Sequence, residues 1–184
     1  MAFEAVIHAK LFHMKLLAEI SEATLGLGDA EQLNTQYELR KSARAILLDS
    51  AGNMATQYLG TYRYHKLPGG GVDVGESIEE ALVREVKEEV GCDCVVERPI
   101  GMTVEYRNKY KLLHISYCFL AQVQGAIGTP ALEPGEIEEG QETLWLPPAT
   151  VLQKMRQDEP EKFEGHFILA REQAFLKEYL KSES

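Results

Sequence analysis

The sequence is poor in cysteine. Its three cysteines are Cys92, Cys94 and Cys118. Cys92 and Cys94 are separated by one residue and have no second Cys or His pair at zinc-ligand spacing, so we expect no zinc site. An odd and sparse set of this kind is typical of reduced, buried thiols in a cytosolic protein.

The sequence also lacks a long apolar run. No stretch approaches the ~20 residues that a membrane-spanning helix needs. Residues 1–20 mix Glu, His and Lys among their apolar side chains, which is unlike a signal peptide. We therefore expect a cytoplasmic protein that does not engage a membrane.

Positive charge is in deficit, because 19 Lys and Arg residues stand against 29 Asp and Glu residues, for a formal net charge of −10. This balance leaves no basic surface for counterion-release binding to long nucleic acid. A small polyanionic substrate stays compatible with it if a bound divalent cation supplies the compensating charge.

What the chain does contain is an ordinary globular composition, with 45% hydrophobic and 26% charged residues. We assign residues 37–184 to one domain and residues 1–36 to an N-terminal extension that serves as a packing arm or homodimer contact. Apolar residues of the extension fit a helix-like spacing. They are Val6, Ile7, Leu11, Met14, Leu17 and Ile20.

The remaining pattern predicts an α+β fold in which a mixed sheet lies between helices. Apolar or β-branched runs bounded by turn residues predict strands at 43–48, within 54–64, at 94–104, 111–123 and 143–146. Helices are predicted at 77–90, 148–157 and 167–180, and a long loop at 125–140. Ser77 and Glu80 form a capping box at the start of the first helix, and Gly91 ends it.

Within that first helix, Glu85, Glu88 and Glu89 stand at positions i, i+3 and i+4, so their carboxylates lie on one side. Clustered carboxylates raise one another's pKa unless a cation sits among them. Carboxylate oxygens suit Mg²⁺ or Mn²⁺. A solvated acidic face explains the helix equally well when the helix is considered alone.

The flanking residues favour the metal site. Gly70, five residues, Glu76, seven residues and then Arg84-Glu85-Val86-Lys87-Glu88-Glu89-Val90-Gly91 match the Nudix box at every fixed position. Cys92 stands where that pattern has an aliphatic residue, and Cys is small enough to bury in the same way. The sequence therefore resembles the Nudix (MutT-like) hydrolases, a resemblance that implies an α/β/α sandwich.

The resemblance also implies the chemistry, which is Mg²⁺-dependent hydrolysis of the pyrophosphate linkage in a nucleoside diphosphate linked to another moiety, with Mn²⁺ as a substitute cation. By analogy, Glu88 and Glu89 are the principal metal ligands. Glu85 binds the metal directly or through water, and the Gly69 carbonyl adds a ligand. Arg84 holds the glutamates in position.

Supporting roles in the box fall to Gly70, Glu76 and Gly91 by the same analogy. The loop ahead of Trp145 resembles a stretch of MutT-like enzymes that contributes a catalytic glutamate. We favour Glu139 as this general base, and Glu136, Glu138 and Glu142 are its rivals. An acidic loop without a catalytic role is the alternative.

Substrate contacts are less well marked. Basic and aromatic residues around the box and the 105–111 hairpin could meet phosphates or a nucleobase. The candidates are Arg63, Lys66, Tyr106, Arg107 and Tyr110. Core packing is the alternative explanation for the tyrosines.

Several substrates and one other function stay open. An ordinary or oxidised dNTP, a dinucleoside polyphosphate and an NDP-sugar are alternative substrates. The proline that marks ADP-ribose hydrolases about 15 residues past the box is missing, because Pro99 is too near. A nucleotide-binding sensor that does not hydrolyse its ligand is the alternative function, although the three box glutamates are all present.

Overall fold

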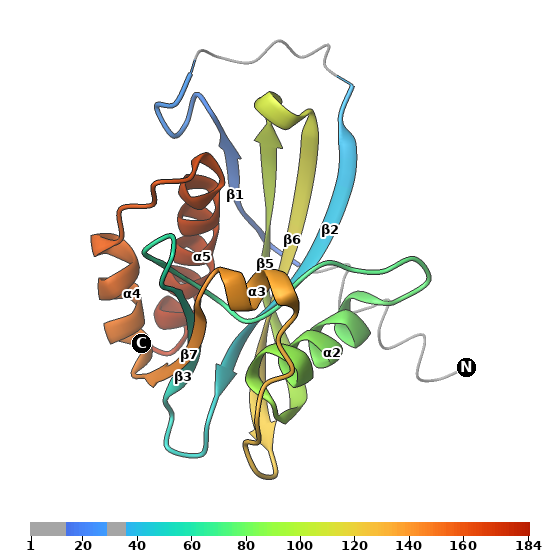
Figure 1. The fold of residues 1–184 in the computed structure, drawn as a ribbon, viewed down its shortest axis with the longest axis vertical. Coiled ribbons are helices and arrows are strands. Elements are labelled where there is room, and N and C mark those ends of the chain that lie inside the picture. The colour runs from blue at the N-terminus through green and yellow to red at the C-terminus, as the bar shows by residue number, and fades with distance from the viewer. Residues whose placement is uncertain (1–13, 29–35) are drawn as a thin grey trace.

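The computed structural model describes residues 14–28 and 36–184. It confirms the α+β class, because a mixed sheet of seven strands carries helix α2 on one face and helices α4 and α5 on the other (Figure 1). The strands are β1 (Leu16–Ser21), β2 (Glu38–Leu48), β3 (Met54–Leu59), β4 (Tyr64–Lys66), β5 (Asp93–Arg107), β6 (Leu112–Gln124) and β7 (Gln141–Leu146). The helices are α2 (Ile78–Val90), α3 (Pro134–Glu138), α4 (Pro148–Gln157) and α5 (Phe163–Ser182), with a 3₁₀ turn at Asn108–Tyr110.

The strand order is β1-β5-β6-β2-β3-β4, with β7 paired to β3. Strands β1 and β5 and strands β2 and β6 pair in parallel, while the other pairs are antiparallel. None of the described helices combines the length and the apolar character that crossing a membrane requires.

Strand β2 forms the centre of both halves of the core because its side chains alternate between the two faces. Ala43, Ala45 and Leu47 pack with α2, whereas Ile46 and Leu48 pack with α4 and α5. Both faces are buried, which explains why this strand reads as an unbroken apolar run from Ala45 to Leu48.

Most predicted elements are confirmed. The Ser77 side chain accepts a hydrogen bond from the Glu80 N–H, the Glu80 side chain accepts one from the Ser77 N–H, and Gly91 ends α2 in the left-handed conformation. The three cysteines are free and buried, as predicted.

Two predictions are wrong in detail. The helix-like spacing in the N-terminal extension fails for Leu17 and Ile20, because both lie in β1, where pairing with β5 supplies the backbone hydrogen bonds. Val6, Ile7 and Leu11 lie outside the described residues. The 125–140 loop contains the short helix α3, which Pro134 begins. The domain boundary at residue 36 stays a prediction.

The sheet opens beside β2, and this opening positions the glycine-rich loop. Strands β2 and β3 pair only at Leu48 and Met54. Further along, segment 67–72 takes the free edge of β2: the Ala45 N–H donates to the Pro68 carbonyl at 2.9 Å and the Ala43 N–H to the Gly70 carbonyl at 3.0 Å. The chain then continues into α2.

Gly69 and Gly70 allow the close contacts that this arrangement needs. Gly69 has φ of +129°, and a Cβ there would lie 2.1 Å from the Ala43 carbonyl oxygen. At Gly70 a Cβ would lie 2.3 Å from an oxygen of the Glu85 carboxylate. Only glycine lets the loop approach both the strand and α2 so closely.

Gly69→Ala should therefore lower the free energy of unfolding by about 3–5 kcal/mol, since strain and a backbone clash combine. Gly75→Ala is the matched control, because Gly75 also has a positive φ, +88°, but has open space around it. That variant should lose only ~1–2 kcal/mol. Urea unfolding of both variants measures the difference, and equal losses would show that the contact with Ala43 is unimportant.

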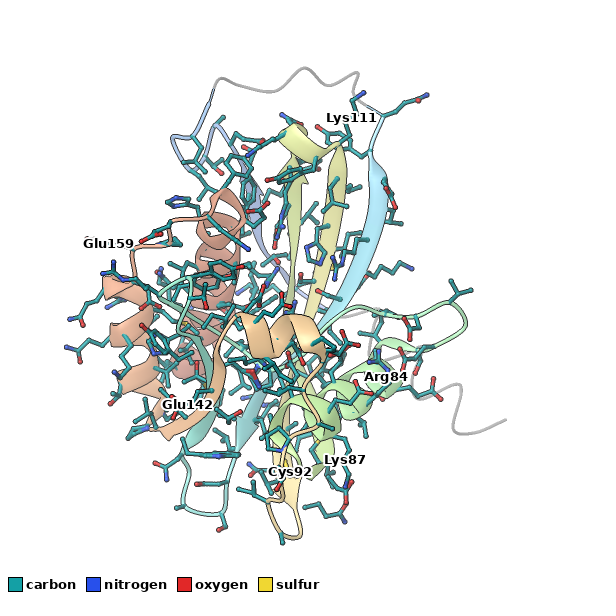
Figure 2. The ribbon with its side chains drawn as sticks, in the orientation of Figure 1. Arg84, Lys87, Cys92, Lys111, Glu142 and Glu159 are labelled. Atoms are coloured by element: carbon teal, nitrogen blue, oxygen red, sulfur yellow. The ribbon has the colours of Figure 1, made fainter. Side chains whose placement is uncertain are left out.

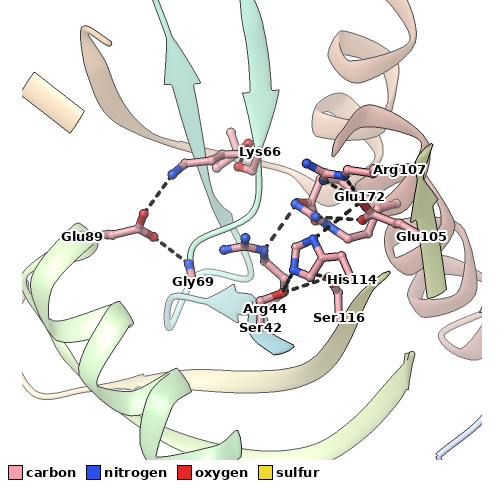
Figure 3. A network of polar contacts seen from close by, with 12 residues as sticks. Ser42, Arg44, Lys66, Gly69, Glu89, Glu105, Arg107, His114, Ser116 and Glu172 are labelled. Atoms are coloured by element: carbon pink, nitrogen blue, oxygen red, sulfur yellow. Dashed lines mark hydrogen bonds and ion pairs between the residues drawn. The ribbon is translucent and has the colours of Figure 1, made fainter. Parts of the chain in front are cut away.

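A buried ionic cluster connects the sheet with α5 (Figure 3). We define it as Arg44, Glu105, Arg107, His114, Arg171 and Glu172, all at most 7% exposed. Arg171 donates to Glu105 at 2.9 Å and to Glu172 at 2.7 Å. Arg107 donates to Glu105 at 2.7 Å. Buried charges are tolerated when they are paired in this way.

His114 is the titratable member of the ionic cluster. Burial, together with the charges of Arg171 and Arg107, lowers its pKa to about 4 against the opposing effect of Glu105. Its Nε2 atom lies 3.0 Å from the Ser42 hydroxyl. His114 is therefore neutral at pH 7, and three guanidinium groups in the cluster face two carboxylates.

The lowered pKa of His114 predicts a loss of stability in mild acid. The unfolded chain binds a proton at His114 near pH 6.5, whereas the folded chain binds it only near pH 4. As the pH falls between these values, this residue alone should remove up to about 3 kcal/mol from the free energy of unfolding.

His114→Gln should flatten the dependence of unfolding free energy on pH between about 6.5 and 4, as measured by urea unfolding in a series of buffers. Ser42→Ala is the control, because it removes a hydrogen-bond partner of His114 but keeps the imidazole. The unfolding free energy of this variant should therefore depend on pH as it does in the wild type. If the unfolding free energy of His114→Gln depends on pH as in the wild type, the loss of stability in mild acid does not come from His114.

Candidate active site

A polar cavity of about 230 Å³ lies where the glycine-rich loop, α2 and α3 meet. This volume is below the ~300 Å³ at which sites for drug-sized ligands begin, so the cavity suits a small charged group better than a whole nucleotide. It is lined by Arg40, Arg44, Lys66, Gly69, Gly70, Gly71, Arg84, Glu85, Glu88, Glu89, Glu133 and Glu136.

Arg84 connects the glutamates of α2 to the loop. Its Nη1 atom donates to Glu85 at 2.8 Å and to Glu88 at 3.1 Å. Its Nε and Nη2 atoms donate to Glu76, each at 3.0 Å, and Nη2 also donates to the Gly71 carbonyl. Arg84 projects from α2 in Figure 2, and its contacts are those expected of a residue that orients the carboxylates.

Glu89 is the most buried of the three glutamates, at 2% exposure. Its carboxylate accepts hydrogen bonds from Lys66 Nζ at 2.9 Å and from the Gly69 N–H at 2.6 Å (Figure 3). Charge-assisted bonds of this kind are strong. Glu89 therefore ties the C-terminal half of α2 to the loop that lies on β2.

The carboxyl groups in the cavity affect one another's protonation. Burial, and secondarily the charge of Glu89, raises the pKa of Glu85 against the effect of Arg84. Burial and a hydrogen bond with Glu89 raise the pKa of Glu136 to about 7. By contrast, hydrogen bonds from Arg84 lower the pKa of Glu76. The cavity thus concentrates negative charge that lacks full compensation.

The donor set suits a hard divalent cation. Five carboxylates and four cationic side chains line the cavity, for a net charge of one negative, which one Mg²⁺ would turn to one positive. In residues 14–28 and 36–184 no three acidic, His or Cys side chains already stand at metal-ligand geometry. Arg84, Lys66 and the Gly69 N–H are hydrogen-bonded to the Glu85 and Glu89 oxygens that a cation would use.

Each of the three residues predicted to support the box contacts the loop, α2 or the segment that follows α2. Glu76 is bonded to Arg84, and Gly70 lies against Glu85. Gly91 ends α2 with φ of +78°, and a Cβ there would lie 2.8 Å from the Thr129 backbone. Gly91 therefore lets the 125–140 segment approach the end of the helix.

Glu136 and Glu139 lie differently relative to the cavity, and the choice of a general base between them stays a prediction. Glu136, one of its rivals, lines the cavity from α3, whereas Glu139 lies at the end of α3 and is not among the lining residues. The Glu139 carbonyl accepts a hydrogen bond from the Thr61 N–H at 3.1 Å. The position of Glu136 depends on a helix that the sequence analysis had assigned to a loop.

Of the five predicted substrate contacts, only Lys66 lines the cavity. Arg63 is exposed and lies 3.6 Å from Glu161. Arg107 is held in the ionic cluster by Glu105.

Tyr106 and Tyr110 belong to the end of the β5–β6 hairpin, whose tip Figure 2 marks at Lys111, well away from Arg84. The Tyr106 hydroxyl donates to Glu19 at 3.4 Å, and the Tyr110 hydroxyl donates to Glu164. Packing and surface contacts, the alternative explanation for the tyrosines, therefore describe both better than contact with a ligand at this cavity.

Three lining residues were missed by the sequence analysis: Arg40, Arg44 and Glu133. Arg40 and Arg44 lie on β2 with Ser42 between them, so that the three share one face of the strand. Arg40, Ser42 and Arg44 at every second position carried this signal, but Lys41 between them and the apolar run that follows obscured it.

Comparison with known proteins identifies the family. A model of the NUDIX domain matches residues 38–166. Over 59 residues, or 32% of this chain, the sequence is 41% identical to "Putative nudix hydrolase 1" of Caenorhabditis elegans, and the match spans only 15% of that protein's length.

Solved structures share the fold. A MutT protein from Methanosarcina mazei Go1 superposes with a TM-score of 0.57 at 19% identity, covering 81% of this chain and 98% of that one. An ADP-ribose pyrophosphatase from Streptococcus suis has a TM-score of 0.50 at 20% identity, covering 79% of this chain and 92% of that one. Since the family model matches most of the sequence and the box residues line one cavity, the chain belongs to the NUDIX family.

Proposed function

We propose that this NUDIX protein hydrolyses the pyrophosphate linkage of a nucleoside diphosphate linked to another moiety, with Mg²⁺ or Mn²⁺ as its cofactor. The observation that carries the proposal is that Glu85, Glu88 and Glu89 line one small cavity against the glycine-rich loop. The presence of Lys66 and Arg84 in the same cavity adds donors for phosphate oxygens.

Metal binding falls to Glu88 and Glu89, with Glu85 and the Gly69 carbonyl as further ligands. When bound, the cation supplies charge for the phosphate oxygens and lowers the pKa of the attacking water. Arg84 keeps Glu85 and Glu88 together through its bonds to both.

Glu136 is the proposed general base. It lines the cavity from α3 and contacts Glu89, so its carboxylate would face a water held at the metal ligands. The carboxylate accepts the proton of that water as the new P–O bond forms, and the phosphate on the other side of the bridge leaves.

Several further assignments remain proposals. A cytoplasmic location, a homodimer contact through residues 1–36 and the choice among nucleotide substrates rest on the sequence. The ADP-ribose pyrophosphatase from Streptococcus suis shares this fold, so ADP-ribose belongs in a test panel with dNTPs, 8-oxo-dGTP, NDP-sugars and dinucleoside polyphosphates. A sensor that binds nucleotide without hydrolysis is disfavoured by the complete set of box glutamates.

Glu88→Gln and Glu89→Gln should each abolish hydrolysis of the best substrate in that panel, with Mg²⁺ or Mn²⁺ present, because each variant removes a charged metal ligand. Phosphate or nucleotide release measures the effect. Glu79→Gln, on the same helix but outside the cavity, should retain activity. Retained activity in either box variant would contradict the assignment of that glutamate as a metal ligand.

Glu136→Gln should lower kcat by about 10²–10⁴, the usual contribution of a general base. Glu139→Gln should lower kcat less than tenfold, because Glu139 does not line the cavity. Steady-state kinetics of the two variants decide between them. The opposite ranking would return the role to Glu139, and a loss below tenfold in both variants would show that neither glutamate is the general base.

A further inference from the structure

Arg44 lies where the candidate active site meets the ionic cluster. Its side chain extends from β2 and lines the cavity together with the α2 glutamates. Figure 3 shows its guanidinium between two groups, with Glu89, Lys66 and Gly69 on one side and Glu105, His114 and Glu172 on the other. Only 9% of the side chain is exposed.

Two of the three nitrogen atoms of the Arg44 guanidinium lack a hydrogen-bond acceptor within the described residues. Its Nε and Nη1 atoms are both buried and have no partner. The carboxylate of Glu172 lies 3.7 Å from Nε, beyond hydrogen-bond distance. A buried charged donor without an acceptor costs free energy, so its presence in a folded protein needs an explanation.

Glu172 is bonded to Arg171 through one oxygen only, and its other carboxylate oxygen is buried without a hydrogen-bond partner among the described residues. One Glu172 oxygen accepts hydrogen bonds from Arg171 Nε at 3.1 Å and from Nη2 at 2.7 Å. Glu105 is likewise shared by Arg171 and Arg107. With His114 neutral, the cluster holds one more cation than anions, and Arg44 is the cation whose Nε and Nη1 atoms are not hydrogen-bonded to a carboxylate.

The position of Arg44 determines which anion can supply the missing charge. The ligand must reach the cavity, and the carboxylates there are the proposed metal ligands. A phosphate group bound to that metal would bring anionic oxygens to the same small space. A guanidinium matches a phosphate group because its N–H donors form a planar fork.

We propose that Arg44 is a phosphate-binding residue, which binds non-bridging oxygens of the substrate's diphosphate on the side away from the α2 glutamates. The Glu172 carboxylate forms an ion pair with the same guanidinium, at 3.7 Å from Nε. This assignment rests on the proposed function for its substrate class, a diphosphate.

Binding of methylenediphosphonate, a diphosphate that cannot be hydrolysed, tests the proposal by calorimetry with Mg²⁺ present. Arg44→Gln should weaken binding about 10- to 100-fold, the effect of losing hydrogen bonds to a charged group. Arg44→Lys keeps the charge but loses the fork, so its affinity should be intermediate. Arg98→Gln is the matched control, because Arg98 is paired with Glu183 at the surface, and its affinity should stay within twofold of wild type.

Thermal unfolding without ligand separates a ligand-binding role from a structural one. Arg44→Gln removes a buried cation that lacks an acceptor, so its midpoint should equal or exceed that of wild type. A lower midpoint, or a variant that does not fold, would identify Arg44 as a structural cation and overturn the proposal. Unchanged affinity in Arg44→Gln, or no binding by wild type, would also overturn it. The calorimetric assay measures binding and not turnover, so failure of the proposed hydrolysis can be told apart from failure of this proposal. In that case binding would still depend on Arg44, while the substrate panel would give no product.

Discussion

The attachment of segment 67–72 to the free edge of β2 is the constraint on which the candidate site depends. The sheet opens because β2 and β3 pair only at Leu48 and Met54. The loop then forms the hydrogen bonds that β3 does not, and its glycines allow contact with both Ala43 and Glu85. Without this attachment neither the Gly69 N–H nor Lys66 would reach Glu89, and α2 would not face β2 across a cavity.

Charge compensation is the second constraint. The α2 glutamates are brought together by helix periodicity, and their repulsion is offset by Arg84, Lys66 and a backbone N–H. Arg84 and Lys66 line the same cavity in which we propose that the phosphates bind. A divalent cation taking over the carboxylates would leave the basic side chains available to the substrate, which links metal binding to phosphate binding.

Stability and function make opposing demands on the ionic cluster. Arg171 donates to both Glu105 and Glu172 and so connects α5 to the sheet. Arg44 lies at the edge of that network with donors unpaired, a cost that a folded protein tolerates most readily at a binding site. Helix α5 thus contacts a residue of the cavity, since its Glu172 forms an ion pair with Arg44 without lining the cavity itself.

The parts of the site that depend on local geometry could be predicted from the sequence. The capping box of α2, its end at Gly91 and the common side of Glu85, Glu88 and Glu89 follow from helix periodicity and from the conformations glycine allows, so a short segment contains all the information. Which distant residues join them depends on the fold. Arg44 comes from a strand, Glu136 comes from a short helix within an apparent loop, and Tyr106 and Arg107 do not line the cavity. These outcomes depend on strand order, on the opening beside β2 and on the packing of α5, and none of these is fixed by the spacing of residues along the chain.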